Sequence, residues 1–302
     1  MLVALVKLIC RLLAISSRPS SFRFGCRIGA VMHLFIRSKV KVARDALRLS
    51  FPDWPEQKIR EVTRAVFVNQ GIFAAEFMRQ IGRPADDPIQ DMRIDREDED
   101  RFHAAMREHK SVIFLVAHIN NYEYLAAWAA RQYPVSIITK TIKPPALGEF
   151  IRQARAANGL MEFPHHGSYR SVLRNLRAGG CVGFILDQNI PRGRGVFVSF
   201  FGRPACTSPG LAMMSAQAGA PVMPGYTVRE GDRLRVKFGE LVPAPADREI
   251  NTLQEYTQRY TTLLESIIRE HPESWIWIHK RWKTQPQPGD RITRPDGTSY
   301  VA

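Results

Sequence analysis

Cysteine and acidic residues are both scarce in this sequence. The four cysteines among 302 residues show no CxxC spacing, so neither a zinc site nor a disulfide framework is indicated, and a reducing setting fits best. Only 29 Asp and Glu face 43 Lys and Arg, which gives a formal net charge of +14. This surplus predicts an anionic partner, such as nucleic acid, phospholipid or an acidic or phosphorylated carrier.

The N-terminus has no hydrophobic run long enough to cross a bilayer. Residues 1–15 are largely apolar, but about 20 such residues are needed to span the hydrocarbon core, and Lys7 and Arg11 interrupt the run. We expect an amphipathic helix at a membrane interface, with a helix docked on the domain as the alternative. Residues 1–50 contain ten basic residues and one acid, which favours the membrane.

Length and composition allow one large domain or two small ones. Of the 302 residues, 45% are apolar, enough to bury a sizeable core. We divide the chain into a helical N-terminal region over residues 1–85, an α/β core over residues 86–283 and a flexible tail over residues 284–302, which is rich in Pro, Gly and polar residues. The acidic stretch 86–100 is expected to be a solvated linker.

Hydrophobic periodicity predicts helices first and an alternation of strands and helices afterwards. Residues 22–49 and 56–81 carry apolar residues at helical steps. Residues 111–117, 135–139 and 181–186 are short apolar runs typical of strands buried on both faces. The fold class is therefore α/β, with a mostly parallel central sheet flanked by helices, a helical N-terminal region and a C-terminal hairpin. Further elements expected are helices at 102–109, 122–132, 147–158, 169–176, 207–219 and 253–270, a strand at 196–201, and hairpin strands at 221–229 and 233–241.

The segment from His118 to Glu123 is the sharpest candidate site, because it follows a buried strand and opens a helix, where open α/β sheets place their ligands. If His118 lies in the turn and Glu123 in the first helical turn, the carboxylate can fix the imidazole tautomer. The other ring nitrogen is then free to deprotonate a hydroxyl. The alternative is structural: Asn120 or Asn121 caps the helix, Glu123 complements its dipole and His118 is a core histidine.

Further sequence blocks in a fixed order accompany this motif. HINNYEYL resembles the histidine block of the late lipid A biosynthesis acyltransferases, within the lysophospholipid acyltransferase superfamily, where H-x4-D/E precedes an apolar helix. The chain departs from that family at Asn189, where a second Asp is usual, and at Tyr122, where Trp is usual. The other similar blocks, between about Lys39 and Lys283, are ARDALRLSFPDWPEQKIREVTRAVFVNQGIFAAEF, RQARAANGLMEF, LRAGGCVGFILDQN, RGVFVSFFGRPACTSPGLAMMSAQAGAPVMPGY and WIWIHKRWK.

The resemblance implies an O-acyltransferase of lipopolysaccharide biosynthesis. It would move a fatty acyl chain from an acyl-carrier-protein or CoA thioester to a hydroxyl of a membrane glycolipid, with a lipid A precursor as first choice. His118 would take the hydroxyl proton, and Glu123 would orient and charge-stabilise His118, without an acyl-enzyme. Arg155 would bind a donor phosphate or the tetrahedral oxyanion. A solvated helix charge is the alternative for Arg155.

Other candidate substrate-binding residues lie at a strand end and in flexible turns. Asp187 would support the dyad or bind the sugar, with a turn-capping role as the alternative. Gln188 extends the same polar mouth, and Asn121 belongs to the histidine block. Arg192 and Arg194 suit a lipid phosphate or phosphopantetheine, or else a solvated turn. Neither a cofactor nor a metal is expected.

Charge and resemblance together predict a protein on the cytoplasmic face of the inner membrane, peripheral or anchored by its N-terminal helix, with an anionic membrane surface as partner. Trp275, Trp277 and Trp282 would form an interfacial belt or else belong to the core. Another lipid acceptor (a lysophospholipid or other glycolipid) remains open, as does a nucleic-acid-binding or lipid-binding protein. Nucleic acid is not the expected partner, because the basic residues lie in an apolar helix rather than along a polar face.

Overall fold

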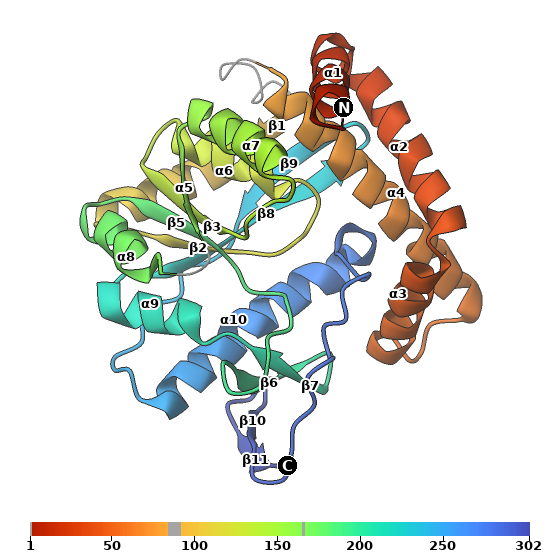
Figure 1. Cartoon of the computed structure of the whole chain (residues 1–302). Helices are drawn as coiled ribbons and strands as arrows, with labels where there is room; N and C mark the ends of the chain where they lie inside the picture. The colour runs from red at the N-terminus through yellow and green to blue at the C-terminus, as the bar shows by residue number, and fades with distance from the viewer. Residues whose placement is uncertain (1, 84–91, 165–166) are drawn as a thin grey trace.

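The central sheet is the scaffold of the α/β region (Figure 1). In this computed structural model, which describes residues 2–83, 92–164 and 167–302, its strands follow the order β1-β9-β8-β2-β5-β3-β4. Neighbouring strands are parallel except β8 and β9, which form the expected hairpin. The expected fold class is therefore confirmed. The strands are β1 Met92–Ile94, β2 Ile113–Val116, β3 Val135–Thr139, β4 Leu160–Pro164, β5 Cys181–Ile185, β8 Val222–Glu230 and β9 Arg233–Phe238.

Alternate residues of the strands face two separate cores. Ile113 and Leu115 of β2 belong to a large core shared with α8, α9 and α10, whereas Phe114 and Val116 belong to a second core shared with α5 and α6. All four side chains are buried, as the continuous apolar run predicts for a strand covered on both faces. The helices of this region are α5 Arg96–Glu108, α6 Tyr122–Ala130, α7 Pro145–Ala157, α8 Tyr169–Arg177, α9 Gly210–Ala218 and α10 Ile250–Glu270.

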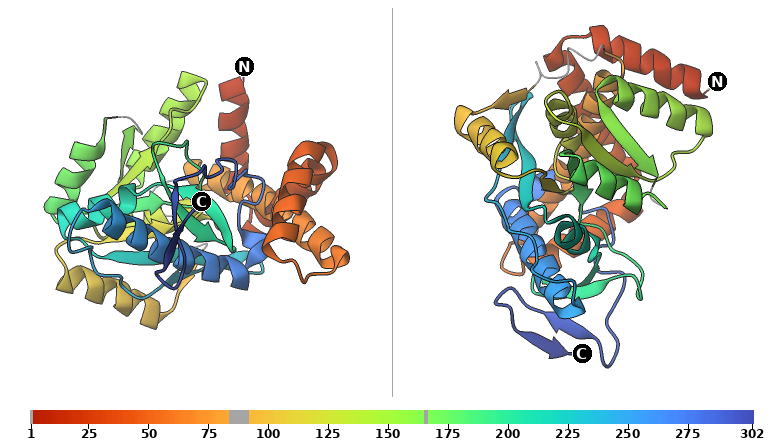
Figure 2. Two further views of the ribbon diagram at one scale, coloured as in Figure 1. Left: turned by 90° about the horizontal axis from the view of Figure 1, so that it is seen from below. Right: turned by 90° about the vertical axis from the view of Figure 1, so that its left-hand side faces the viewer.

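The N-terminal helices lie together at one side of the molecule, where Figures 1 and 2 show them in the red to orange part of the chain. The helical pattern expected over residues 22–49 is divided between α2 and α3 at Ile36, whose backbone angles (φ −97°, ψ 56°) leave the helical range. Helix α4 occupies the expected residues 56–81. These helices are α1 Leu2–Ile15, α2 Arg18–Phe35, α3 Arg37–Ser50 and α4 Glu56–Ile81.

Helix α1 presents one face to the protein and another to solvent. Cys10 is fully buried in a cluster with residues of α4 and α7, so the helix is docked on the domain. Leu5, Leu8, Leu12 and Ile15 are nevertheless 52–84% exposed, and we call these four residues the α1 stripe. In the described part of the chain no helix combines the length and hydropathy needed to cross a membrane.

The C-terminal residues belong to a second sheet, which corrects the flexible tail expected over residues 284–302. Ile292 is buried against Phe197, and the Gln254 side-chain nitrogen donates to the carbonyl oxygens of Phe197 (2.8 Å) and Arg291 (2.9 Å). These contacts order a segment whose composition is polar. The sheet, in the order β11-β10-β6-β7, consists of β6 Val196–Phe200, β7 Arg203–Thr207, β10 Arg291–Thr293 and β11 Ser299–Val301.

Within the acidic stretch 86–100, expected to be a solvated linker, residues 92–94 and 96–100 belong to regular elements. Residues 86–91, and the expected domain boundary before them, lie outside the described residues. The remainder forms β1 and the start of α5, where Asp98 is buried and accepts a hydrogen bond from the backbone nitrogen of Phe238 (2.9 Å). Acidic residues in a first helical turn also complement the helix dipole, so the acidic residues of this stretch stabilise the N-terminus of α5.

Helix α2 packs on α4 at a distance that only glycine allows. A Cβ at Gly71 would lie 2.3 Å from both the Gly25 carbonyl oxygen and the Gly29 nitrogen. Inside a helix Ala is about 1 kcal/mol more favourable than Gly, yet we expect Gly71→Ala to lower the free energy of unfolding by about 1–3 kcal/mol or more, measured by denaturant titration. The control Arg27→Ala, at an exposed position of α2, should change it by less than about 0.5 kcal/mol. Similar values for both variants would contradict the close helix contact.

Candidate active site

The carboxyl ends of three strands bring the candidate site together. His118 follows β2, Lys140 follows β3 and Asp187 follows β5. Because these strands are parallel neighbours in the sheet, the residues after them meet at one edge. His118 and Lys140 line a pocket of about 620 Å³ at this edge. The candidate site therefore lies where the strand pattern predicts it.

Asp187 holds His118 by two hydrogen bonds. Its Oδ1 lies 2.8 Å from His118 Nδ1, and its Oδ2 accepts the His118 backbone N–H at 2.7 Å. Trp275 Nε1 also donates to Oδ2, at 2.7 Å. Because the carboxylate accepts the proton at Nδ1, the lone pair of His118 lies on Nε2. The side-chain nitrogen of Gln188 is 3.3 Å from that Nε2.

The environment of His118 favours its protonated form. Burial by itself opposes a charged imidazole, but the Asp187 carboxylate overcomes this and raises the pKa of His118 above its ordinary value of 6.5. Burial likewise opposes the charge on Asp187, whose side chain is fully buried. The imidazole and the N–H donors around the carboxylate nevertheless hold the pKa of Asp187 below its ordinary value. The pair can thus accept and hold a proton at His118.

The structure corrects the expected contact between His118 and Glu123. Both residues lie where the motif predicts, in the turn and in the first turn of α6. The Glu123 carboxylate, however, accepts two hydrogen bonds from Arg155, at 2.5 Å from Nη2 and 3.2 Å from Nε. A planar guanidinium fits a carboxylate in this bidentate way. The acid that orients the imidazole is Asp187, while the charge of Glu123 helps to raise the pKa of His118.

The surroundings of Arg155 also correct its expected role as an anion site. Its Nη1 donates to Glu162 at 3.1 Å, so one positive charge faces two carboxylates. A donor phosphate or an oxyanion would meet repulsion from Glu123 and Glu162 at this position. Since Arg155 is only 9% exposed, it is not a solvated helix charge either. Arg155 joins α6 to α7 and β4 beside the pocket.

The other predicted binding residues divide between the pocket, the interior and the surface. Gln188 lines the pocket. Asn121 is fully buried, and its Oδ1 accepts a backbone N–H of α6 at 3.2 Å, so it caps the helix and does not line the pocket. Arg192 is ion-paired with Asp290 at 2.9 Å, and Arg194 is exposed. Both arginines fit the alternative of a solvated turn.

The tryptophans of the closing WIWIHKRWK block belong to the core and form no interfacial belt. Trp275 and Trp277 are completely buried, and Trp282 is 9% exposed. Trp275 supplies the third donor to the buried carboxylate, and His279 Nε2 accepts the backbone N–H of Asn189 at 3.0 Å. The block thus supports the loop after β5 from behind, a role that the residue types alone did not predict.

The apolar part of the pocket lining belongs to the core beside α6, and we call this part the apolar branch. Phe114, Gly183 and Ile137 are cross-strand neighbours, so the middle strand contributes no side chain to this row. A Cβ at Gly183 would lie 3.7 Å from Ile137 Cγ2, an ordinary contact distance, and a larger group would project into the branch. Apolar residues that line the branch are Phe114, Val116, Leu125, Ala129, Val135, Ile137, Ile185 and Phe238.

Gly183 and Lys140 line the pocket, but neither was predicted from the sequence as a site residue. A glycine inside an apolar strand was the available signal for Gly183, since such a glycine often marks a place where a ligand approaches closely. Lys140 directly follows β3 and is exposed at the pocket. Two Lys or Arg side chains line the pocket among the described residues. Arg155 is paired with two carboxylates, whereas Lys140 has no ion-pair partner there. The available signal for Lys140 was its position at the carboxyl end of a strand, the same signal that indicated Asp187.

Comparison with known proteins agrees with the resemblance of the sequence blocks. Residues 1–284 match the sequence model of the family described as bacterial lipid A biosynthesis acyltransferase. The chain is 21% identical over 274 residues to the lipid A biosynthesis lauroyltransferase of Escherichia coli K12, covering 89% of this chain and 87% of the relative. It is 24% identical over 272 residues to the palmitoleoyltransferase of the same organism, covering 87% and 84%.

Removal of the Asp187 charge should shift the titration of His118. The carboxylate stabilises the imidazolium, so in Asp187→Asn the effect of burial is opposed only by the charge of Glu123, and the pKa of His118 should fall below its wild-type value. The neutral base form should then appear at lower pH than in the wild-type protein, as followed by NMR of the histidine ring. The control Asp53→Asn, at the surface, should not move the curve. An unshifted curve in Asp187→Asn would show that this carboxylate does not set the pKa.

Proposed function

Since this chain belongs to the family of bacterial lipid A biosynthesis acyltransferases, we propose that it transfers a fatty acyl chain from an acyl-carrier-protein or CoA thioester to a hydroxyl of a membrane glycolipid. The proposed acceptor is a lipid A precursor. One observation carries the proposal: an imidazole fixed by a buried carboxylate lies beside an apolar pocket. Such a site suits a hydroxyl nucleophile and an acyl chain at the same time.

His118 is the proposed general base. The acceptor hydroxyl approaches Nε2 in place of the Gln188 amide, and its oxygen attacks the thioester carbonyl as its proton passes to Nε2. The tetrahedral intermediate then expels the thiolate, which takes the proton from His118 and leaves as a thiol. Asp187 stabilises the imidazolium between these two proton transfers and keeps the ring in one orientation, as a buried carboxylate does for a catalytic histidine.

Glu123 and Arg155 are proposed as positioning residues. The carboxylate of Glu123 lies beside the pocket, and its charge favours the imidazolium. Arg155 holds that carboxylate in place and limits the repulsion between Glu123 and Glu162. Loss of Arg155 would leave the buried carboxylate of Glu123 without its partner, which commonly costs about 3–5 kcal/mol, whereas loss of Glu123 would leave Arg155 paired with Glu162 alone. Their contribution is therefore to the shape and charge of the pocket wall.

Direct transfer, without an acyl-enzyme, is supported by the state of the cysteines. Burial raises the pKa of the Cys181 thiol to about 12 and that of Cys10 to about 11. The pKa values of Cys26 and Cys206 are also raised, chiefly by burial. A nucleophilic cysteine needs a lowered pKa that provides thiolate at neutral pH. None of these thiols is therefore prepared to carry an acyl group.

The two ends of the pocket suit the two ends of the donor. The apolar branch beside α6 would take the acyl chain, because it is lined by aliphatic and aromatic side chains. Lys140 at the mouth would attract a phosphate of the donor, which both CoA and phosphopantetheine carry. Between them His118 faces the position of the thioester carbonyl. This order, anion then thioester then hydrocarbon, matches the chemical order of an acyl thioester.

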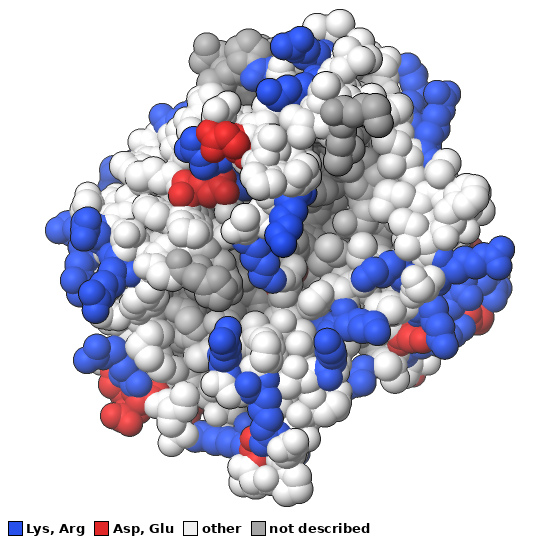
Figure 3. Space-filling model, viewed as in Figure 1, with Lys and Arg blue, Asp and Glu red and all other residues white. Residues whose placement is uncertain are grey.

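A peripheral position on the cytoplasmic face of the inner membrane is also proposed. The α1 stripe is an apolar surface on a docked helix, the arrangement of a helix lying in a membrane interface. Figure 3 shows Lys and Arg side chains on both sides of the hollow at the centre of one face. Basic surface of this kind is attracted by anionic lipids. A lipid acceptor could then reach the pocket from the membrane.

The proposed activity is tested with purified protein, acyl-carrier-protein and acyl-CoA donors, and a panel of lipid acceptors. We expect one ester, identified by mass spectrometry. His118→Ala should lower its rate of formation by about 10²- to 10⁴-fold with an unchanged melting curve, whereas His109→Ala should retain activity. Wild-type turnover in His118→Ala would eliminate the proposed base, and absence of ester with every acceptor would eliminate the acyl transfer.

Gly183 is expected to set how far an acyl chain can enter the apolar branch. Gly183→Ala should have a small effect, because the added methyl makes only an ordinary contact, whereas Gly183→Leu should fill the branch. We expect Gly183→Leu to lower kcat/KM for the longest donor at least about tenfold relative to a short donor. The ratio of kcat/KM values across a chain-length series measures this effect. An equal loss for all chain lengths would indicate damage to the sheet instead.

A further inference from the structure

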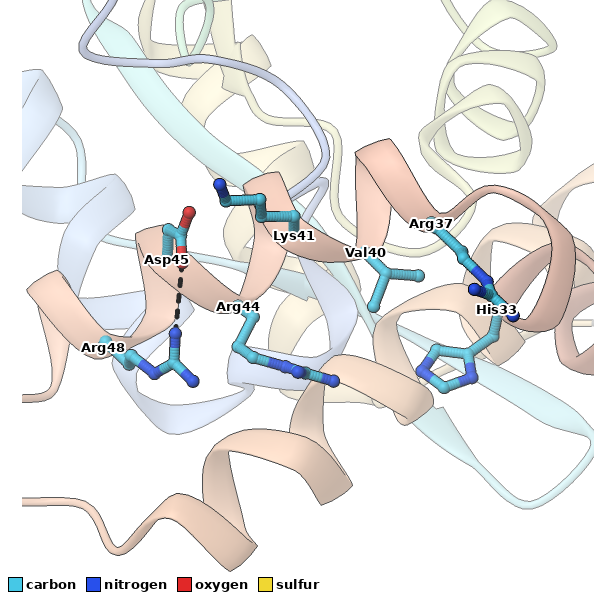
Figure 4. A pocket seen from close by; sticks show the side chains of 7 residues that line it. All are labelled: His33, Arg37, Val40, Lys41, Arg44, Asp45 and Arg48. Atoms are coloured by element: carbon cyan, nitrogen blue, oxygen red, sulfur yellow. Dashed lines mark hydrogen bonds and ion pairs between the residues drawn. The ribbon is translucent and has the colours of Figure 1, made fainter.

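A second, basic groove lies on the N-terminal helices α2 and α3, and it shares no lining residue with the pocket of the candidate active site. It has a volume of about 460 Å³ and is formed by one face of α3 and by His33 at the end of α2. We call it the α3 groove. Figure 4 shows Arg37 and Arg44 extending toward the ring of His33, with Val40 between them. Lys41 and Arg48 are the other cations at this groove.

Three of the four Lys and Arg side chains at the α3 groove lack an ion-pair partner within 4 Å among the described residues, although the Glu56 carboxylate interacts with Arg44 over a longer distance. Arg48 is held by Glu56 (2.7 Å) and Asp45 (3.1 Å). No described residue forms an ion pair or a hydrogen bond with the side chains of Arg37, Lys41 or Arg44. The Nε of Arg44 is moreover buried without an acceptor among the described residues. The guanidinium groups of Arg37 and Arg44 line the groove, where they can donate to an anion from outside the chain.

An exposed apolar corner stands next to these cations. At the break between α2 and α3, Leu34 is 65% exposed, Phe35 80% and Ile36 37%. A phenylalanine that is four-fifths exposed protrudes from the surface and does not sit in a cleft. Leu34 and Ile36 on either side extend the patch, and Arg37 follows at once in the sequence. We call residues 34–36 the apolar corner.

We propose that the apolar corner inserts into a lipid surface and that the α3 groove binds the phosphate of an anionic phospholipid headgroup. Three cations without an ion-pair partner supply the attraction, and the guanidinium of Arg44, which lines the groove, donates to a phosphate oxygen. The inserted side chains add the hydrophobic part of the binding. This inference extends the proposed membrane association to a second contact, and it does not depend on the acyl-transfer chemistry.

The combination favours a membrane over an acidic protein. Protein partners cover apolar side chains by complementary surfaces, and protruding residues then need a matching pocket on the partner. A bilayer interface needs no matching shape: it accepts protruding apolar side chains and presents phosphates just above them. The apolar corner would enter the hydrocarbon boundary, and the cations that follow it in the sequence would then lie at the level of the phosphates. With the α1 stripe, the corner would give two separate contacts and so fix the orientation of the protein on the membrane.

Vesicle binding by the full-length protein tests the proposal. The vesicles are phosphatidylcholine alone, or phosphatidylcholine and phosphatidylglycerol in equal parts, and binding is measured by co-sedimentation. Each cation near an anionic surface contributes about 1 kcal/mol, or about fivefold in affinity. Arg37→Gln should therefore weaken binding to the anionic vesicles about fivefold, and Arg37→Gln with Arg44→Gln about 30-fold. Unchanged circular dichroism and melting curves are required of each variant.

The matched control is Lys39→Gln, which removes one charge from an exposed position of the same helix outside the α3 groove. It should weaken binding less than about twofold; a loss equal to that of Arg37→Gln would mean diffuse attraction and would overturn the headgroup site. Phe35→Ser should weaken binding to both kinds of vesicle. Unchanged binding in this variant would overturn insertion of the corner.

A protein partner would give a different result. If the groove variants bound vesicles as the wild-type protein does, but raised KM for an acyl-carrier-protein donor and not for acyl-CoA, the groove would be a protein-docking surface and the proposal would fail. Vesicle binding needs no turnover. Failure of the proposed acyl transfer would therefore leave this measurement intact, and the two failures are distinguishable.

Discussion

The buried carboxylate of Asp187 is the interaction on which the arrangement of the site depends. It accepts hydrogen bonds from the backbone and ring of His118 and from the indole of Trp275. Burial of an ionised carboxylate without such partners costs several kcal/mol. The buried charge of Asp187 is therefore stable only because these three N–H groups donate to it. Through them the turn after β2, the end of β5 and the closing block of the chain are fixed to one another.

The sheet gives this interaction its surroundings. Because alternate residues of the central strands face different cores, the same strand ends carry polar residues at the edge and leave an apolar space behind them. The missing side chain at Gly183 opens that space without breaking the ladder, since its strand pairs on both sides. The polar and apolar halves of the pocket therefore follow from one strand arrangement, with α6 and α7 closing it.

Much of the fold was accessible from the sequence, because long periodic segments and continuous apolar runs have strong signals. The helix over residues 56–81 and the strand over residues 135–139 have the expected bounds. β1, β4 and β7 were missed: β1 and β4 are the edge strands of the central sheet, and β7 carries Pro204, a residue that is rare in strands. The final strands were missed because pairing with β6 and α10 orders them, and no local pattern reports such a contact.

The site was accessible in part for the same reason. The position of His118 after a strand follows from local pattern, and so does Asp187 at the end of the next predicted strand in the sheet. Which carboxylate contacts the imidazole could not be inferred, because Glu123 and Asp187 both had plausible positions and the choice depends on Arg155. That arginine comes from α7, far away in sequence, and its bidentate pairing with Glu123 leaves the imidazole to Asp187.

The dependence of Asp187 on Trp275 has a consequence for the order in which the protein matures during synthesis. A ribosome releases the N-terminal helices long before residue 275, and domains begin to fold as they emerge. The residues of the α1 stripe and the apolar corner are therefore synthesised early, while the carboxylate still lacks its indole partner. The proposed membrane contacts therefore leave the ribosome before the imidazole can be held in place, so an incomplete chain would carry the surface proposed for attachment without a complete site.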